Sequence, residues 1–312
     1  MANVCKTEKI AIIGAGRVGT TFAFAALIRN IVAEVMLVDI DQERCKGEVL
    51  DLAHGLSHVN SGKVYQGTLK QAATADIIVI TAGVAQKPGQ TRLQLVETNA
   101  KIIKGILKEM GKINPMAILI IVSNPVDVLT YVAQKCSNLP AGQIFGSGTD
   151  LDTARLQYLL GKHLNMHPRS VNAFIIGEHG DSELAVWSSA NVAGIPIKKT
   201  RGYSPAKMRA YMTETRSAAG KIIKLKGATF FAISMALIEI CTAILKDQNL
   251  VLPVSTYIEN YCGIKDVCLA VPAVIGRSGI KKLIKLPLAA AEKKQLQKSA
   301  RILKKTLKLI NC

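Results

Sequence analysis

The chain has 312 residues, of which 49% are hydrophobic, and a formal net charge of +18. This length is enough for a large buried core and favours two domains over one, while the hydrophobic content and only 10 prolines argue against disorder. No charged start followed by an apolar core precedes the first apolar run, which argues against a secretory signal, whereas the basic charge leaves nucleic acid or an acidic membrane open as partners.

The first 150 residues alternate short apolar runs with longer amphipathic segments. The short runs are rich in Ile and Val, which is typical of strands buried on both faces of a parallel sheet. Strands are therefore predicted at residues 9–13, 34–38, 76–80 and 117–122, and helices around residues 17–30, 42–56, 91–112 and 125–136. Strand and helix in repetition predict right-handed crossovers and a Rossmann-type, doubly wound α/β sheet.

The alternation weakens after about residue 146, so we expect a first domain over residues 1–146 and a second, mixed α+β domain over residues 147–312. The second part is predicted to open with a helix near 150–163 and a strand from Val171 to Ile176. Residues 227–245 approach membrane-span length, but Thr229, Ser234, Glu239 and Thr242 interrupt them, which favours a buried core helix.

Half of the charge excess lies in residues 281–312, which hold ten Lys or Arg against the single acid Glu292. The same stretch has apolar residues at helical spacing, namely Leu296, Ala300, Leu303, Leu307 and Ile310. We favour a terminal helix with one docked face and one solvated basic face, because neither Trp nor Phe is present to anchor it in a membrane.

Seven cysteines are scattered along the chain, with no CxxC pair and no histidine cluster near them. This spacing predicts neither a metal site nor a disulfide framework. The odd number of cysteines is typical of a reducing compartment, so a cytoplasmic location is expected.

Gly14, Gly16 and Gly19 form the motif GAGRVG between the first predicted strand and the first predicted helix. Glycines at this position permit a tight turn and let a pyrophosphate approach the positive end of the helix. The alternative is that they only pack strand against helix. Asp39, which ends the next strand 20 residues after Gly19, is placed to accept hydrogen bonds from ribose hydroxyls and to repel a 2′-phosphate, so NAD is preferred over NADP.

His179 lies in the sequence GEHGD, a glycine-flanked turn after an apolar run, where a side chain can point into a cleft. Oxidation of a hydroxyl to a carbonyl requires a base of near-neutral pKa, and an imidazole supplies one. The residues alone leave a structural role for His179 open.

Six segments together are specific: GAGRVG, VDID, TAGVAQKPGQTRL, SNPVD, LDTARL and IIGEHGDSE. In order and spacing the chain resembles the lactate and malate dehydrogenase family over most of residues 9–187. The resemblance implies an NAD-dependent 2-hydroxy acid dehydrogenase in which His179 exchanges the proton, Asp152 orients the imidazole and Arg155 binds the substrate carboxylate.

The resemblance also implies that Arg92 and Asn124 polarise the substrate carbonyl and that Thr229 lines the side-chain pocket. The cofactor would contact the three glycines and Asp39 together with Val18, Gly83, Val84, Val122, Ser123 and Asn124. Each role has an ordinary alternative: a charge at a helix N-terminus, a surface cation, a turn residue before Pro125 or a filler of a buried helix.

The loop from Gly83 to Thr91 is expected to close over the substrate. In the family, the residue at Gln86 contacts the substrate's side chain, and malate enzymes carry arginine there. Neutral Gln86 would leave the second carboxylate of oxaloacetate unpaired, so pyruvate is expected as substrate.

Three alternatives remain open: malate dehydrogenase, a binder of nucleic acid or anionic surfaces, and an NAD-binding protein without catalysis. The resemblance implies a homotetramer that requires neither nucleic acid nor membrane. It further implies weak or absent activation by fructose 1,6-bisphosphate, because Gln157 and Asn172 occupy the positions of the arginine and histidine that bind this effector in bacterial relatives.

Overall fold

The computed structural model describes residues 8–60, 62–84 and 91–310. The α-helices are α1 (Arg17–Ile28), α2 (Gln42–His54), α3 (Leu69–Ala72), α4 (Arg92–Met110), α5 (Val126–Cys136), α6 (Asp150–Leu164), α7 (Pro205–Lys226), α8 (Phe231–Leu245) and α9 (Ala290–Leu309). The strands are β1 (Lys9–Ile13), β2 (Glu34–Val38), β3 (Lys63–Gln66), β4 (Ile77–Ile80), β5 (Ile118–Ile121), β6 (Ile144–Gly146), β7 (Val171–Asn172), β8 (Ile175–Ile176), β9 (Leu184–Ala185), β10 (Asn191–Val192), β11 (Ile195–Pro196), β12 (Leu250–Ile258), β13 (Val267–Gly276) and β14 (Gly279–Leu283). Short 3₁₀ helices are η1 (Gly55–His58), η2 (Ala141–Gln143), η3 (Pro168–Ser170) and η4 (Ile197–Lys199).

The main sheet has nine strands in the order β14-β13-β12-β6-β5-β4-β1-β2-β3. Strands β1 to β6 are parallel and stand in the order 3-2-1-4-5-6 of a dinucleotide-binding sheet. The predicted Rossmann-type, doubly wound α/β fold is therefore confirmed. Strand order reverses between β1 and β4, and ligands of such sheets bind beyond the carboxyl ends of the strands at this point.

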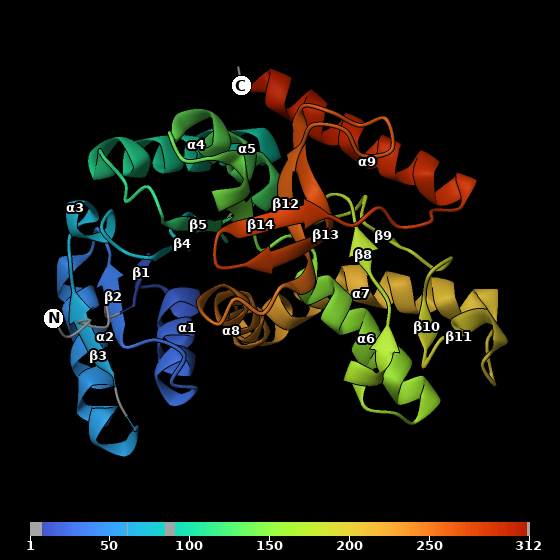
Figure 1. Ribbon diagram of the computed structural model, residues 1–312, viewed down its shortest axis with the longest axis horizontal. Coiled ribbons are helices and arrows are strands. Elements are labelled where there is room, and N and C mark those ends of the chain that lie inside the picture. The colour runs from blue at the N-terminus through green and yellow to red at the C-terminus, as the bar shows by residue number, and fades with distance from the viewer. Residues whose placement is uncertain (1–7, 61, 85–90, 311–312) are drawn as a thin grey trace, which may run out of the picture.

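Helices cover both faces of the sheet, because alternate residues of each buried strand point to opposite sides. Ile10 and Ile12 of β1 belong to a core with α1 and α8, whereas Ala11 and Ile13 belong to a core with α4 and α5. Figure 1 shows these two helical layers on either side of the strands. The reversal point is thus held between two rigid layers.

The predicted strands in the first half lie close to the observed ones: β4 begins one residue later than predicted, and β5 is one residue shorter at each end. Strands β3 and β6 and helix α3 were not predicted. The sheet also continues beyond residue 146, because β12 pairs antiparallel with β6 through Ser255 and Gly146. The division into domains at residue 146 stays a prediction.

The single strand predicted from Val171 to Ile176 is wrong. The chain forms β7 and β8, which belong to different small sheets: Asn172 pairs with Asn191 of β10, and Ile175 pairs with Ala185 of β9. A change of partner after Asn172 interrupts the ladder. This switch carries the chain back to the main sheet, where Gly177 bridges to Ala270 of β13.

The buried core helix predicted over residues 227–245 corresponds to α8, which is shorter than predicted and buried on one face only. It begins only at Phe231, and one face packs in the core while Phe231 and Met235 are 59% and 70% exposed. The core lies on one side of this helix, with α1 among its contacts. None of the helices among the described residues has both the length and the apolar character required to cross a membrane.

The docked terminal helix is confirmed. In α9 the predicted apolar positions Leu296, Ala300, Leu303 and Leu307 are buried against β13 and α5. The lysines between them face outward, so this helix bears a basic solvated face.

Candidate active site

The predicted glycine motif connects β1 to α1. Gly14 has a φ of +111°, and a Cβ there would meet the Ala82 nitrogen at 2.7 Å. A Cβ on Gly19 would approach the Gly14 carbonyl oxygen to 2.0 Å. Packing therefore requires glycine at these two positions, in agreement with the alternative that the glycines pack the strand against the helix.

Gly16 differs, because a Cβ there would have the Arg44 guanidinium at 3.8 Å as its nearest neighbour. It is the N-cap of α1, and no side chain caps the amides of the first turn, which includes Val18. Free amides at the positive end of a helix beside an open glycine suit a pyrophosphate. These residues fit a dinucleotide.

Asp39 follows β2 and faces this loop. Its Oδ2 accepts a hydrogen bond from the Ala15 amide at 2.6 Å, and the Gly14 amide donates to the Val38 carbonyl at 2.7 Å. A carboxylate oxygen has two lone pairs, so Asp39 retains acceptor capacity for ribose hydroxyls. The same group both orders the loop and suits the nucleotide.

The remaining cofactor positions lie at the ends of β4 and β5. The amides of Val122 and Ser123 both donate to the Ile80 carbonyl, and the Ser123 hydroxyl donates to Ala82. A Cβ on Gly83 would lie 3.4 Å from the side chains of Asn99 and Ser123, and Val84 is 40% exposed. The structure thus gathers the predicted cofactor residues at the carboxyl edge of the sheet.

The reacting pair is formed by α6 and the turn after β8. His179 Nδ1 lies 2.6 Å from Asp152 Oδ2, and the Asp152 side chain is 2% exposed. Asp152 lies in the first turn of α6, as expected of a charge at a helix N-terminus. Its carboxylate, however, points at the imidazole rather than at solvent. The His179 side chain keeps 25% exposure, which leaves the ring accessible.

The charges of His179 and Asp152 stabilise each other. Burial opposes the charged form of His179, but the Asp152 carboxylate outweighs it and raises the pKa of His179 to about 9. Burial alone would raise the pKa of Asp152, yet the imidazole and the Arg155 guanidinium lower it below its usual range. The pair therefore holds a proton on the imidazole and a negative charge on Asp152 at neutral pH.

Arg155 lies three residues after Asp152 on the same face of α6. Its Nη1 donates to Asp152 Oδ1 at 2.7 Å, and the side chain is 14% exposed. This is not a surface cation. One arm of the guanidinium is fixed by Asp152, while the planar fork has further N–H groups for a second carboxylate.

For the other predicted substrate residues, the structure gives no contact with Asp152, His179 or Arg155 among the described residues. Asn124 follows β5 with an exposed side chain whose Oδ1 accepts from the Val126 amide at 3.3 Å, so it does act as a turn residue. Thr229 is half-buried between α7 and α8. Arg92 begins α4, but its side chain lies outside the described part of the structure, as does Gln86 altogether.

Asp152, His179 and Glu183 offer one ligand atom each, all within 4.8 Å of one another. A metal ion there would compete with the Arg155 cation, which already bonds to Asp152. The arrangement suits proton transfer better than metal binding.

Comparisons with known proteins agree with this geometry. Sequence models of the lactate/malate dehydrogenase NAD-binding domain and α/β C-terminal domain match residues 8–146 and 149–311. The chain is 49% identical over 304 residues to an L-lactate dehydrogenase of Gloeobacter violaceus, covering 96% of this chain and 92% of the relative. It is 46% identical to an L-lactate dehydrogenase of Clostridium botulinum (strain Kyoto / Type A2), covering 98% of both chains.

The chain belongs to the lactate/malate dehydrogenase family. A solved lactate dehydrogenase from a Medee basin deep-sea metagenome library superposes with a TM-score of 0.94 at 39% identity, covering 98% of this chain and 99% of that one. The fold and the NAD-binding domain expected from the resemblance are thereby confirmed.

This family member has supporting residues that sequence reasoning missed. Asp127, which is 2% exposed, accepts from the His179 amide at 2.7 Å and from the Ser255 hydroxyl at 2.6 Å. Burial raises the pKa of Asp127 to about 6, against these two hydrogen bonds. Asp127 therefore fixes the backbone of the catalytic turn from α5.

Asn99 of α4 was also missed. Its side chain accepts from the Val84 amide at 2.9 Å and donates to the Asn124 carbonyl at 2.7 Å. It is 2% exposed and joins the ends of β4 and β5. The one sequence signal for both residues is a polar side chain inside an otherwise apolar helical face, at Asp127 and at Asn99.

Proposed function

We propose that this chain is an L-lactate dehydrogenase that reversibly transfers a hydride between NADH and pyruvate, giving (S)-lactate and NAD. The observation that carries the proposal is the fixed set of Asp152, His179 and Arg155 beside a dinucleotide site. A proton carrier and a carboxylate-binding cation are the two groups that reduction of a 2-oxo acid requires. The relatives named L-lactate dehydrogenase support this substrate.

The roles follow from the geometry. Because Nδ1 of His179 bonds to Asp152, Nε2 is the atom that gives the proton to the carbonyl oxygen and takes it back from lactate. NADH, when bound, supplies the hydride to the carbonyl carbon. Asp152 stabilises the imidazolium, and the free N–H groups of Arg155 bind the substrate carboxylate and orient it.

We assign Arg92 and Asn124 to the carbonyl oxygen, where negative charge develops, and Thr229 and Gln86 to the substrate's methyl group. The test is the oxidation of NADH with pyruvate, oxaloacetate and branched 2-oxo acids offered in parallel. A preference for oxaloacetate would make the chain a malate dehydrogenase, and no turnover would leave a cofactor-binding protein.

The activity is expected to depend on pH in opposite senses for the two directions. Pyruvate reduction needs the protonated imidazole, so its kcat/KM should fall as pH rises through about 9, the raised pKa of His179. Lactate oxidation needs the neutral imidazole, so its kcat/KM should rise over the same range. Steady-state rates across pH measure both limbs, and coincident profiles would contradict the assignment of His179.

Substrate choice is expected to change in Gln86→Arg. A positive charge in a closed site would pair with the second carboxylate of oxaloacetate, shifting the ratio of kcat/KM values toward it by about 3 kcal/mol. Gln248→Arg is the control, since it adds the same charge at an exposed position after α8. An equal effect of both changes would mean that Gln86 does not contact the substrate.

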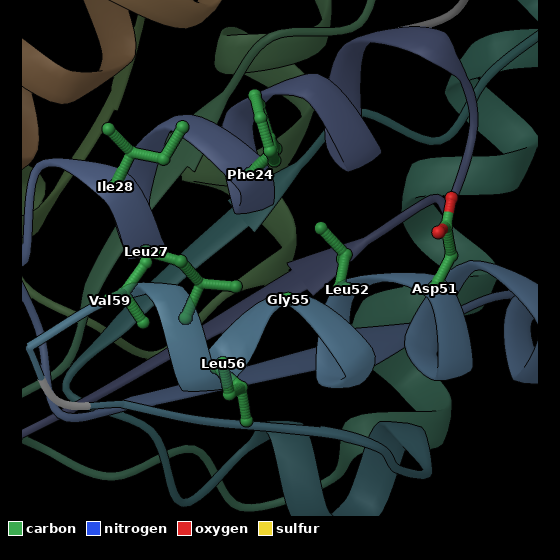
Figure 2. Close-up of a pocket in the computed structure, with 8 residues that line it drawn as sticks. All are labelled: Phe24, Leu27, Ile28, Asp51, Leu52, Gly55, Leu56 and Val59. Atoms are coloured by element: carbon green, nitrogen blue, oxygen red, sulfur yellow. The ribbon is translucent and has the colours of Figure 1, made fainter.

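We further propose a homotetramer in the cytoplasm. Apolar side chains are exposed on two helices that pack together, Phe24 and Ile28 of α1 and Phe231 and Met235 of α8. Figure 2 shows Phe24 and Ile28 at an apolar hollow closed by Leu52, Leu56 and Val59. Such faces are typical of subunit contacts, and light scattering measures the subunit number. The thiols of Cys45, Cys241, Cys262 and Cys268, which form no disulfide, support a reducing compartment such as the cytoplasm.

A further inference from the structure

A second acidic side chain lies beside the catalytic pair, and the proposed reaction does not use it. Glu183 precedes β9, is 2% exposed, and its Oε1 has no hydrogen-bond partner. Its carboxyl group lies with those of the cluster, where ligand atoms of Asp152, His179 and Glu183 are within 4.8 Å of one another. A buried carboxyl group in this position needs a physical account.

Two carboxyl groups attract each other only when one of them carries a proton. Carboxyl oxygens of Glu183 and Asp152 lie within 4.8 Å of each other, where a proton on one of them would serve a hydrogen bond between the two groups. The proton belongs to Glu183, because Asp152 already accepts from Arg155 and His179, which stabilise its negative charge. Burial, followed by the charge of Asp152, raises the pKa of Glu183 to about 9.

The charged groups around Glu183 also favour its protonated form. The charged groups that act on Glu183 are Asp152 of α6, His179 of the catalytic turn and Arg216 of α7. Arg216 directs its Nη2 to the backbone carbonyl of Glu183. Arg216 is exposed, so solvent screens its charge, whereas Arg155 and His179 are already paired with the buried Asp152 carboxylate. An ionised Glu183 would therefore place a second negative charge beside Asp152 in a buried position that these two cations already neutralise only once.

We propose that Glu183 is a positioning residue whose protonated carboxyl group donates a hydrogen bond to Asp152 and limits how tightly Asp152 holds the proton on His179. The inference rests on the proposed roles of Asp152 and His179. A carboxylate with fewer donors is more basic toward the imidazole, and an imidazole held too strongly is a poor acid for pyruvate reduction. Glu183 thereby tunes the proton exchange without contacting the substrate.

The test compares Glu183→Gln, which keeps a neutral donor, with Glu183→Leu, which removes it. In Glu183→Gln the pH profiles of both directions should match those of the unchanged protein. In Glu183→Leu both limbs should move to higher pH by about one unit, since Asp152 loses one charge-assisted hydrogen bond. Glu214→Gln, at an exposed position on α7, is the matched control for removing a carboxyl group.

Infrared difference spectra test the proton directly and need no turnover. The carbonyl stretch of a protonated carboxylic acid should be present at neutral pH and lost in Glu183→Gln but not in Glu214→Gln. Absence of that band, a downward shift of the limbs in Glu183→Gln, or unshifted limbs in Glu183→Leu would each overturn the proposal. A protein that keeps the band but turns over neither pyruvate nor lactate would instead overturn the proposed function.

Discussion

Replacement of His179 by asparagine is expected to lower kcat for pyruvate reduction by about 10³-fold, the middle of the range for a general acid. Asparagine retains an N–H group near the position of Nδ1, so the hydrogen bond to Asp152 and the fold should persist. The acidic Nε2 is lost. NADH affinity should stay nearly unchanged, because the nucleotide contacts belong to the loop after β1, to Asp39 and to the ends of β4 and β5. Steady-state rates and a fluorescence titration of NADH separate the two effects.

His54→Asn serves as the control, since His54 is exposed at the end of α2 and should tolerate the same change without loss of rate. A collapse of NADH affinity in His179→Asn together with the rate would assign His179 a structural role. The proton carrier would then have to be sought elsewhere.

The fold was predictable where burial alone decides the pattern. Strands β1 and β2 lie at their predicted positions because both sides of each are buried, which makes the whole run apolar. Strand β3 was missed, since it stands at the edge of the sheet and its sequence KVYQ is half polar. Strand β6 has only three residues, too few for any periodicity.

The sequence predicted which residues form the catalytic pair and the carboxylate-binding cation. It did not predict the residues that hold them in place. Asp152 and Arg155 share a helical face, so their proximity follows from spacing. The groups that fix His179 come from other elements: Asp127 lies 52 residues away in sequence and Ser255 lies 128 residues beyond Asp127. No local pattern records such contacts, because they depend on how β12 pairs with β6.

Replacement of Asp152 by asparagine is expected to lower kcat/KM for pyruvate at neutral pH by about 10²–10³-fold, since the imidazole loses both its charge partner and its orientation. The carboxylate is what raises the pKa of His179 to about 9, against burial. Without it, burial is opposed only by weaker contributions such as that of Asp127, so the pKa of His179 should fall. Both limbs of the pH profile therefore move to lower pH, and pyruvate reduction at neutral pH loses its acid.

The two directions should respond unequally in this variant. Lactate oxidation uses the neutral imidazole, which Asp152→Asn makes available at lower pH. The rate of lactate oxidation in acid should therefore fall less than the rate of pyruvate reduction at neutral pH. Asp150→Asn is the matched control, because Asp150 is also buried in the first turn of α6 and makes no hydrogen bond to His179 in the described structure. If both variants gave the same pH profile, Asp152 would be a helix N-terminal charge and the proton affinity of His179 would be set by its other neighbours.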